Sequence, residues 1–290
     1  MSRVLLRALA KVNYALEVRG TRSDGYHEVS TVMQSVSLAD EVEIETTARG
    51  FEIVTEPEDA EIGPLEENTV YKAVRLLGKM AGIGLSARVR LRKRIPAGAG
   101  LGGGSADAAA TLVGLNELFG LGLSDEELRK VGLKIGADVP FCLSGGTALG
   151  EGIGEVLSPL PAPPPHYLVI AKPAAGAETA RIYQAYDERL RRGNFSASLA
   201  VEALRIGELG ALARALGNDL IPTTKSLVPE VRELEEELLR GGALGATMSG
   251  TGTSVYGIYG SEAEARAVAE GLRTHFVGVY EPVTRGVELL

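Results

Sequence analysis

Glycine is unusually dense in residues 96–107, which read Pro-Ala-Gly-Ala-Gly-Leu-Gly-Gly-Gly-Ser-Ala-Asp. Five of the seven residues in 98–104 are glycine, and ordering such bare backbone is entropically costly. An alternating strand pattern over 86–92 precedes the stretch, and apolar residues at helical spacing follow it over 108–119. Glycines before a helix amino terminus let an anion approach free N–H groups. The order therefore predicts a polyphosphate-binding loop, in which Ser105 could donate its hydroxyl to a phosphate or a metal ion.

Two other glycine-loop chemistries fit this stretch poorly. The spacing of Gly98, Gly100 and Gly103 matches G-x-G-x-x-G, but a dinucleotide fold needs a strand after the helix. Here a second helix begins at Ser124 instead, where Glu127 completes a capping box. A Walker A loop is excluded because no Gly-Lys-Ser/Thr closes the glycines. A flexible linker is disfavoured, since an amphipathic strand leads in and an apolar helix leads out.

Composition narrows the class of protein. The 290 residues carry 38 acidic and 30 basic side chains, for a net charge of −8, which argues against a nucleic-acid partner. The single cysteine, Cys142, excludes an internal disulfide and a multi-cysteine metal site, and it fits a reducing cytoplasm. We expect no signal peptide and no membrane-spanning segment, because no apolar run approaches about 18 residues.

Two short blocks near the amino terminus bring polar groups together. In an alternating strand Lys11 and Asn13 share a face, so they could hold phosphate or hydroxyl groups, or form a solvated strand face. Asp24-Gly25 is a turn signal that places Tyr26 and His27 at the mouth of a hairpin or loop. These rings could stack on a base and hydrogen-bond it; the alternative is a half-buried tyrosine beside an exposed histidine.

Asp138 is the one carboxylate in the otherwise apolar segment 136–143. A buried carboxylate must be paired, capped or used, because leaving it unpaired costs several kcal/mol. It could cap a helix that carries Pro140, or act as a base or electrostatic partner for a substrate hydroxyl. The basic run 92–94 just before the glycine loop leaves a similar choice between steering ATP and lying solvated at a sheet edge.

The remaining pattern predicts an α+β protein of two parts. Five prolines in the seven residues 159–165 form a stiff connector between the parts. The corner at 245–256 is rich in small and hydroxyl-bearing residues and could bring backbone N–H groups near the phosphates. The expected strands are 4–18, 40–46, 51–54, 86–92, 166–171 and 277–287. The expected helices are 68–82, 108–119, 124–135, 178–190, 197–204, 208–216, 229–239 and 261–275.

Five blocks, in order along the chain, resemble the GHMP small-molecule kinases, named for galactokinase, homoserine kinase, mevalonate kinase and phosphomevalonate kinase. They are similar to the branch that phosphorylates 4-diphosphocytidyl-2-C-methyl-D-erythritol. The Asp-Gly-Tyr-His block discriminates this branch, because other GHMP kinases lack it. The first block departs from the usual Pro-Ala-Lys in having Leu9-Ala10-Lys11. The blocks are 11–13, 24–27, 96–107, 136–140 and 249–252.

The resemblance implies residue roles. Asp138 would take the proton from the substrate 2-hydroxyl, and Lys11 beside it would hold it ionised and counter charge on the transferring phosphoryl group. Asn13, Tyr26 and His27 would contact the cytidine end, and Tyr183 would stack on the cytosine. Ser105 and the phosphates would hold Mg²⁺. The loop around the triphosphate of ATP would consist of Pro96, Ala97, Gly98, Ala99, Gly100, Leu101, Gly102, Gly103, Gly104, Ser105 and Ala106.

The resemblance also implies a fold and a reaction. The fold would be the two-domain GHMP kinase fold, with an ATP-binding α/β domain over 1–158 and an α+β substrate domain over 159–290. The reaction would be transfer of the γ-phosphoryl group of ATP, with Mg²⁺, in the non-mevalonate route to isoprenoid precursors. Two alternatives stay open: another GHMP kinase, such as homoserine or mevalonate kinase, and a non-catalytic nucleotide-binding regulator. The sequence does not set an oligomeric state.

Overall fold

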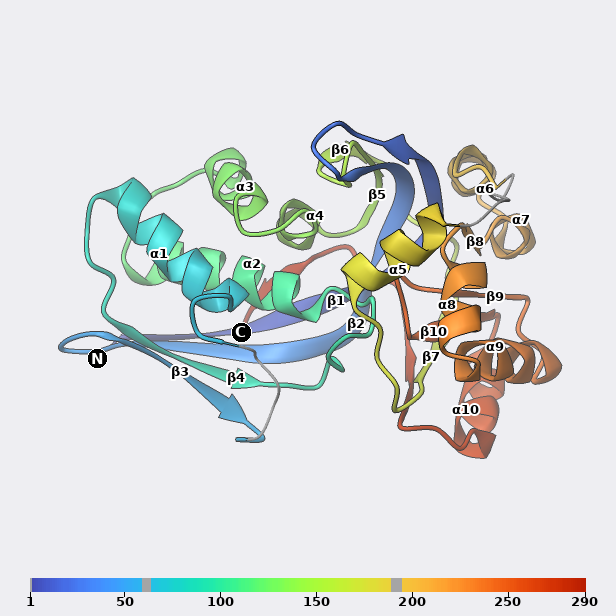
Figure 1. Cartoon of the computed structure of the whole chain (residues 1–290). Helices are drawn as coiled ribbons and strands as arrows, with labels where there is room; N and C mark the ends of the chain where they lie inside the picture. The colour runs from blue at the N-terminus through green and yellow to red at the C-terminus, as the bar shows by residue number, and fades with distance from the viewer. Residues whose placement is uncertain (1, 59–63, 189–194) are drawn as a thin grey trace.

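The computed structural model describes residues 2–58, 64–188 and 195–290 of the chain. Two lobes of mixed helix and strand lie side by side, the first built mostly from the amino-terminal half (Figure 1). This agrees with the α+β class and the two parts expected from the sequence. No helix within the described ranges combines the length and the apolar character needed to cross a bilayer.

The first lobe is built on two long antiparallel strands, β1 (Arg3–Thr21) and β2 (His27–Thr46). The Asp24-Gly25 turn joins them, and Gly25 there has φ +86°, a conformation that glycine adopts without a Cβ clash. The prediction began β2 only at residue 40. It was wrong because both faces of the strand are buried from Val29 to Ser35, so the alternation that marks a half-buried strand is missing.

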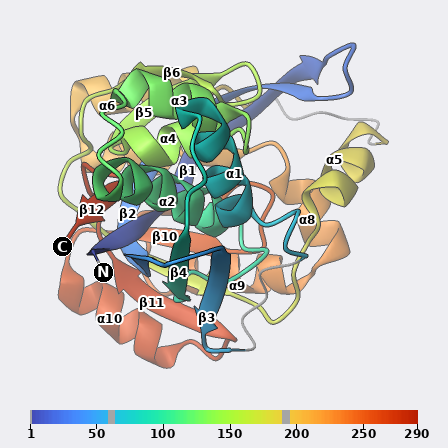
Figure 2. The ribbon, with the colours of Figure 1, turned by 90° about the vertical axis from the view of Figure 1, so that its left-hand side faces the viewer.

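Helices cover one face of this sheet, and the C-terminal segment completes its edge. Figure 2 shows the four helices of the first lobe gathered on one side of β1, β2, β4 and β3. These helices are α1 (Thr69–Ala81), α2 (Gly103–Leu118), α3 (Asp125–Leu133) and α4 (Val139–Ser144). The main strand order is β12-β1-β2-β4-β3, while β5 pairs with β2 and β6, and β8 pairs with β1. The shorter strands are β3 (Phe51–Glu56), β4 (Ala87–Arg92), β5 (Thr147–Glu151), β6 (Val156–Pro159), β8 (Gly217–Asn218) and β12 (Val287–Leu289).

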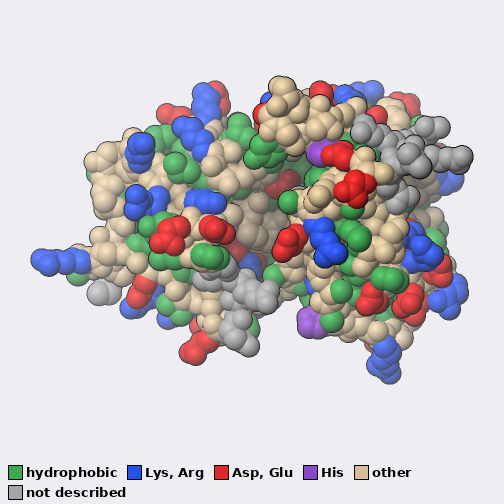
Figure 3. Space-filling view, in the orientation of Figure 1, with side chains coloured by type: hydrophobic (Ala, Val, Ile, Leu, Met, Phe, Trp, Pro, Cys, Tyr) green, Lys and Arg blue, Asp and Glu red, His purple; other side chains and the backbone are tan. Residues whose placement is uncertain are grey.

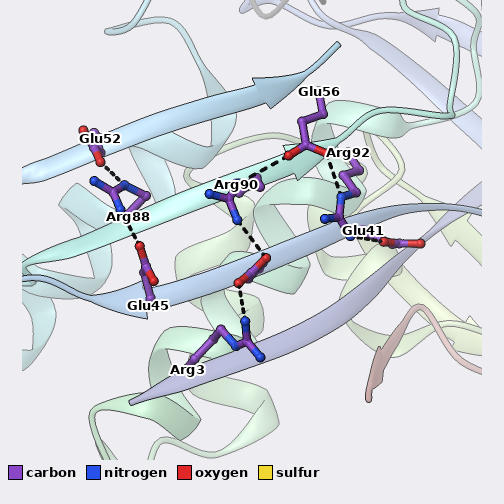
Figure 4. A network of polar contacts seen from close by, with 9 residues as sticks. Arg3, Glu41, Glu45, Glu52, Glu56, Arg88, Arg90 and Arg92 are labelled. Atoms are coloured by element: carbon purple, nitrogen blue, oxygen red, sulfur yellow. Dashed lines mark hydrogen bonds and ion pairs between the residues drawn. The ribbon is translucent and has the colours of Figure 1, made fainter. Parts of the chain in front are cut away.

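The other face of the first sheet carries ion pairs instead of helices. Alternate residues of four neighbouring strands point outward and pair across the strands, as Figure 4 shows. We call this set the charge ladder. It consists of Arg3, Glu41, Glu43, Glu45, Glu52, Glu56, Arg88, Arg90 and Arg92. Opposite charges at facing positions of a sheet stabilise the pairing of its strands, so this face needs no apolar cover.

The second lobe is a four-stranded sheet of order β11-β7-β10-β9, counted within the described residues. The helices α9 and α10 pack against it (Figure 1). Its strands are β7 (Tyr167–Lys172), β9 (Gly245–Met248), β10 (Val255–Tyr259) and β11 (Phe276–Tyr280). Its helices are α5 (Thr179–Asp187), α6 (Ser198–Ile206), α7 (Leu209–Arg214), α8 (Ile221–Leu227), α9 (Glu230–Arg240) and α10 (Glu262–Gly271).

Three details of this lobe differ from the sequence prediction. The single strand expected over 277–287 is two strands, because the chain leaves β11 at Tyr280 and β12 then pairs with β1. The short helix α8 was not predicted. The helix expected over 178–190 is α5, which ends at Asp187, and residues 189–190 lie outside the described ranges.

One apolar core runs through both lobes. Ile170 and Tyr256, from the second sheet, belong to the same buried cluster as Leu6 and Leu112 of the first lobe. A smaller cluster lies between the second sheet and its helices. The proposed boundary at residue 158 stays a prediction: the second sheet is built wholly from later residues, yet β8 and β12 join the first.

Candidate active site

A cleft of about 1,100 Å³ lies between the lobes, and the hollow is visible on the face drawn in Figure 3. Every residue predicted from the sequence to act in the site lines it, except Ala106, which is fully buried. Thus five blocks that are far apart in the sequence meet in one cavity. The lining residues from these blocks include Lys11, Asn13, Tyr26, His27, Asp138, Gly250, Thr251 and the loop from Pro96 to Ser105; Tyr183, outside the blocks, lines it too.

The glycine loop turns sharply before α2, and its backbone faces the cleft. Gly98, Gly100 and Gly102 all have positive φ, which side chains with a Cβ rarely adopt. Gly102 also occupies the N-cap of α2 without a side-chain cap, so its position leaves the first-turn N–H groups for a ligand. At Gly100 a Cβ would lie 2.0 Å from the carbonyl oxygen of Ser249. The glycines therefore serve both the turn and a close approach of the second lobe.

Lys11 and Asp138 face each other across the cleft floor. The Lys11 Nζ atom lies 3.3 Å from Asp138 Oδ2, and the lysine side chain is 5% exposed against 36% for the aspartate. Asp138 occupies the N-cap position of α4, yet its carboxylate makes no capping hydrogen bond. The capping interpretation of Asp138 is thus wrong. The carboxylate is paired with a cation and open to the cavity, as a group that meets a substrate must be.

The side chain of Asn13 makes several hydrogen bonds beneath this pair. Its Oδ1 atom accepts from Lys11 Nζ at 2.9 Å and from the Gly250 N–H at 2.9 Å. Its Nδ2 atom donates to Thr31 Oγ1 at 2.8 Å. Lys11 and Asn13 are almost fully buried, so the solvated strand face is excluded. Register shifts between β1 and β2 flank these two residues, and such irregularities re-aim side chains next to functional sites.

The basic run before the glycine loop divides between two faces of its strand. Arg92 and Arg94 point outward to Glu41, as edge charges do. Lys93 points inward and lines the cleft, where its Nζ atom contacts Asp40 and lies 2.5 Å from Asp107 Oδ2. Strand alternation explains the division, because residue 93 faces the opposite side from its two neighbours.

Burial makes Asp107 an unusual acid. Burial raises the pKa of Asp107 to about 7, although the ammonium group of Lys93 opposes the shift. Its Oδ1 atom is buried without a hydrogen-bond partner in the described part of the chain. Asp40, by contrast, accepts from the N–H groups of Arg94 and Ile95 as well as from Lys93. Together these groups tie the strand before the glycine loop to the helix after it.

Aromatic and acidic side chains close the opposite end of the cleft. The His27 ring stacks on Tyr183 with a centroid separation of 4.4 Å and an interplanar angle of 23°. The His27 Nε2 atom lies 2.9 Å from Asp187 Oδ1. The His27 side chain is 9% exposed, whereas Tyr26 is 62% exposed. The alternative to a ligand-binding role expected a half-buried tyrosine and an exposed histidine; Tyr26 is instead exposed and His27 is largely buried.

The small-residue corner between β9 and β10 reaches the glycine loop from the second lobe. Ser249 Oγ donates to the Gly100 carbonyl at 2.8 Å, and the Ser254 N–H donates to Ala99. The Gly250 N–H donates to Asn13. Through these contacts the corner holds the glycine loop in place. Thr251 lines the cleft and contacts Thr179 of α5 at 3.2 Å between the hydroxyl oxygens.

Sequence reasoning missed several residues of the site. Asp187 stands four residues after Tyr183, which is the spacing of neighbours on one helix face, so the signal was present. Thr31 was missed because the first half of β2 was not recognised as a strand. Asp40 and Asp107 were missed because a lone aspartate in a strand or helix pattern carries no sign of what it will pair with across the fold.

The comparisons with known proteins agree with this geometry. Models of the GHMP kinase N-terminal and C-terminal domains match residues 68–146 and 200–278. A 4-diphosphocytidyl-2-C-methyl-D-erythritol kinase of Pelotomaculum thermopropionicum is 45% identical over 92% of each chain. A solved 4-(cytidine 5'-diphospho)-2C-methyl-D-erythritol kinase is 35% identical and covers 96% of this chain and 98% of its own, with a TM-score of 0.81.

A homoserine kinase from Cytophaga hutchinsonii has a TM-score of 0.79, covering 100% of this chain and 98% of its own. Its 21% identity shows a shared fold and no more. The curated relative, in contrast, is similar over nearly the full length of both chains. The chain therefore belongs to the 4-diphosphocytidyl-2-C-methyl-D-erythritol kinase family of the GHMP kinases.

Proposed function

We propose that this protein transfers the γ-phosphoryl group of ATP to the 2-hydroxyl of 4-diphosphocytidyl-2-C-methyl-D-erythritol. The observation that carries the proposal is the Lys11–Asp138 pair, which faces the glycine loop in a cleft with an aromatic far end. Family membership supports it, since relatives that are 40–45% identical over nearly the whole chain carry that name.

In this proposal Asp138 acts as the base. Its carboxylate accepts the proton of the substrate hydroxyl as that oxygen attacks the γ-phosphorus and the bond to the β-phosphate oxygen breaks, releasing ADP. The Lys11 ammonium group, 3.3 Å away, orients the carboxylate and offsets negative charge on the transferring group. Asn13 holds Lys11 from the other side at 2.9 Å, so the cation has little freedom to move.

The glycine loop, 96–106, would bind the triphosphate through its backbone N–H groups and the amino terminus of α2. Magnesium would screen the phosphate charges during transfer. No group of three His, Cys, Asp or Glu side chains suited to a metal exists among the described residues. An ion held mainly by phosphates and water, with the Ser105 hydroxyl as a protein ligand, fits this donor set, because Mg²⁺ commonly keeps such a shell.

At the far end of the cleft, His27, Tyr26 and Tyr183 would hold the cytidine. One face of Tyr183 is covered by His27, so a base would stack on the opposite face. Tyr26 is exposed enough to close over a bound nucleotide. The side chain of Asn13 is engaged inside the protein, so we infer that it acts on the substrate chiefly through Lys11 and Gly250.

The first experiment measures ADP release from ATP and Mg²⁺ with three acceptors tested separately. These are 4-diphosphocytidyl-2-C-methyl-D-erythritol, mevalonate and homoserine. We expect turnover with the first alone, and phosphorus NMR of the product places the new phosphate on the 2-hydroxyl. Turnover with another acceptor would keep the fold and replace the substrate. ATP binding without turnover on any acceptor would favour a regulator.

The substitution Asp138→Asn tests the base. We expect kcat to fall about 10²- to 10⁴-fold, the usual contribution of a general base, while the Kd for ATP stays within about twofold. Asp125→Asn, at an exposed position in α3, is the matched control and should retain full activity. Wild-type turnover in Asp138→Asn, with an unchanged melting temperature, would remove Asp138 from the mechanism.

A further inference from the structure

Two histidines in this fold are held by partners that dictate opposite ring tautomers. His166 Nδ1 lies 2.8 Å from the Pro164 carbonyl, which can only accept, so its proton is on Nδ1 and Tyr14 donates to Nε2. His27 Nε2 lies 2.9 and 3.1 Å from the two oxygens of Asp187, and a carboxylate also only accepts. The neutral His27 ring therefore carries its proton on Nε2, and Nδ1 is left as a lone-pair acceptor.

We propose that Asp187 is a positioning residue of the nucleotide-binding end, which fixes the Nε2–H tautomer of His27 so that Nδ1 accepts a hydrogen bond from the substrate nucleoside. This inference rests on the proposed function and deepens it. Two contacts support it. The His27 ring stacks on Tyr183 with the ring centroids 4.4 Å apart, and the Nε2 atom of His27 is held by Asp187. Both residues and Asp187 line the cleft.

The chemistry required of the ligand follows from the tautomer. An Nδ1 atom without a proton accepts a hydrogen bond from a donor on the ligand. It disfavours a ligand that places another lone pair opposite it, as buried hydrogen-bonding sites do. A cytidine nucleotide offers donors in the exocyclic amino group of the base and in the ribose hydroxyls. A uridine nucleotide lacks the amino group and presents a carbonyl in its place. Asp187 thereby acts on specificity without touching the reacting atoms.

Nitrogen-15 NMR of the histidine rings tests the tautomer directly, since the chain has three histidines. At pH 8.5, where free imidazole is neutral, we expect His27 as the Nε2–H form and His166 as the Nδ1–H form. His275 is exposed and serves as a reference for averaging. Asp187→Asn can donate as well as accept, so it should shift His27 toward a mixture. An Nδ1–H form of His27 in the wild type, or no shift in Asp187→Asn, would overturn the proposal.

Isothermal titration calorimetry with CDP, UDP and 2′,3′-dideoxy-CDP identifies which group of the nucleotide donates to His27 Nδ1. We expect Asp187→Asn to weaken CDP binding about two- to tenfold, because a mixture leaves about a half to a tenth of the His27 rings in the competent tautomer, and to leave ATP binding unchanged. Loss of the variant's effect with UDP assigns the base amino group, and its loss with the dideoxy nucleotide assigns a ribose hydroxyl. An equal loss for all three would show a merely structural role and overturn the proposal.

Two controls separate this inference from the proposed function. Glu188→Gln removes the neighbouring exposed carboxylate and should change neither the spectra nor CDP binding. Asp187→Glu restores a carboxylate and should recover the Nε2–H form. If no cytidine nucleotide binds the wild type, the proposed function and the ligand assignment both fail. If CDP binds and is insensitive to Asp187, the inference fails while the proposed function stands.

Discussion

Asp107 carries its carboxylate at the start of α2, just after the glycine loop, where its side chain is only 5% exposed. Its partner Lys93 is shared with Asp40, so three charges of net −1 lie together out of solvent. Asp40 accepts hydrogen bonds at both oxygens, from the Arg94 and Ile95 N–H groups and from Lys93, whereas one oxygen of Asp107 has no partner among the described residues. Burial of this carboxylate raises the pKa of Asp107 to about 7; Lys93 opposes the rise and the charge of Asp40 adds to it.

This pKa makes stability depend on pH. The ordinary pKa of an aspartate is 3.8, so between about pH 4 and pH 7 the folded protein holds a proton that the unfolded chain has released. Stability contributed by that proton is present at pH 4 and is lost as pH rises through 7. Because Asp107→Asn cannot titrate, its melting temperature relative to wild type should rise by about 5 °C between pH 5 and pH 8, measured by differential scanning calorimetry.

Asp125→Asn is again the matched control, because Asp125 is exposed at the start of α3. Its melting-temperature difference from wild type should stay flat across the same range. A flat difference for Asp107→Asn as well would mean that the carboxyl is ionised throughout, and that Lys93 compensates its burial fully.

At the scale of elements, the glycine loop is fixed from both sides. The strand before it and α2 after it belong to the first lobe, while the corner at 249–254 holds its middle from the second. Gly98 and Gly100 both have positive φ, but only Gly100 is approached closely by other backbone. Comparing Gly98 with Gly100 therefore distinguishes a glycine required for its positive φ from one required by a close contact with other backbone.

We expect Gly100→Ala to weaken ATP binding by more than tenfold, because a Cβ 2.0 Å from the Ser249 carbonyl forces the loop and the corner apart. Gly98→Ala meets no atom within 4 Å and should change the ATP Kd by less than about threefold. Isothermal titration calorimetry with ATP and Mg²⁺ measures both. Equal effects of the two variants would show that φ alone matters and that the contact with the second lobe does not.

The charge ladder is a second element with testable energetics. Glu43 lies between Arg3 at 3.0 Å and Arg90 at 3.2 Å, and its side chain is only 13% exposed. Glu43→Gln should lower the free energy of unfolding by about 1 kcal/mol, and 1 M NaCl should remove much of that difference. Glu126→Gln breaks an exposed helical pair with Lys130, where water and salt screen the charges, and should change the free energy of unfolding far less. Similar values for the two variants in urea unfolding would mean that the ladder acts as isolated pairs.

At this scale, the sequence could predict those features whose signals lie close together along the chain. The strand, glycine loop and helix were predicted because their signals lie within about 35 consecutive residues. Whether Asp138 caps α4 or faces a partner in the cleft could not be decided, because its partner Lys11 lies more than 100 residues earlier. The hydrogen bond from the Ile95 N–H to Asp40 could not be predicted for the same reason. Sequence patterns report which face of an element is apolar, not which element will lie opposite.

At the scale of the whole molecule, the lobes are joined by more than the connector at 159–165. The Tyr256 hydroxyl of the second lobe donates to the Asn13 carbonyl of the first at 2.8 Å, and Asn218 binds the Met248 and Gly250 carbonyls beside it. The main apolar cluster includes side chains of both sheets. Neither lobe can lose its structure without exposing apolar surface of the other, which couples their unfolding.

We therefore expect one calorimetric transition for the whole chain, with equal calorimetric and van't Hoff enthalpies. Asn116→Ala gives a perturbation confined to the first lobe, because within the described ranges both atoms of the Asn116 side-chain amide hydrogen-bond Leu123. Removing these bonds should lower the melting temperature of the entire transition by about 2–6 °C, since each lost bond destabilises by about 1 kcal/mol. If the lobes unfolded independently, the wild type would show two transitions and Asn116→Ala would move only one of them. A single transition that shifts as a unit would mean that the cleft between the lobes is maintained by the same core that holds each lobe together.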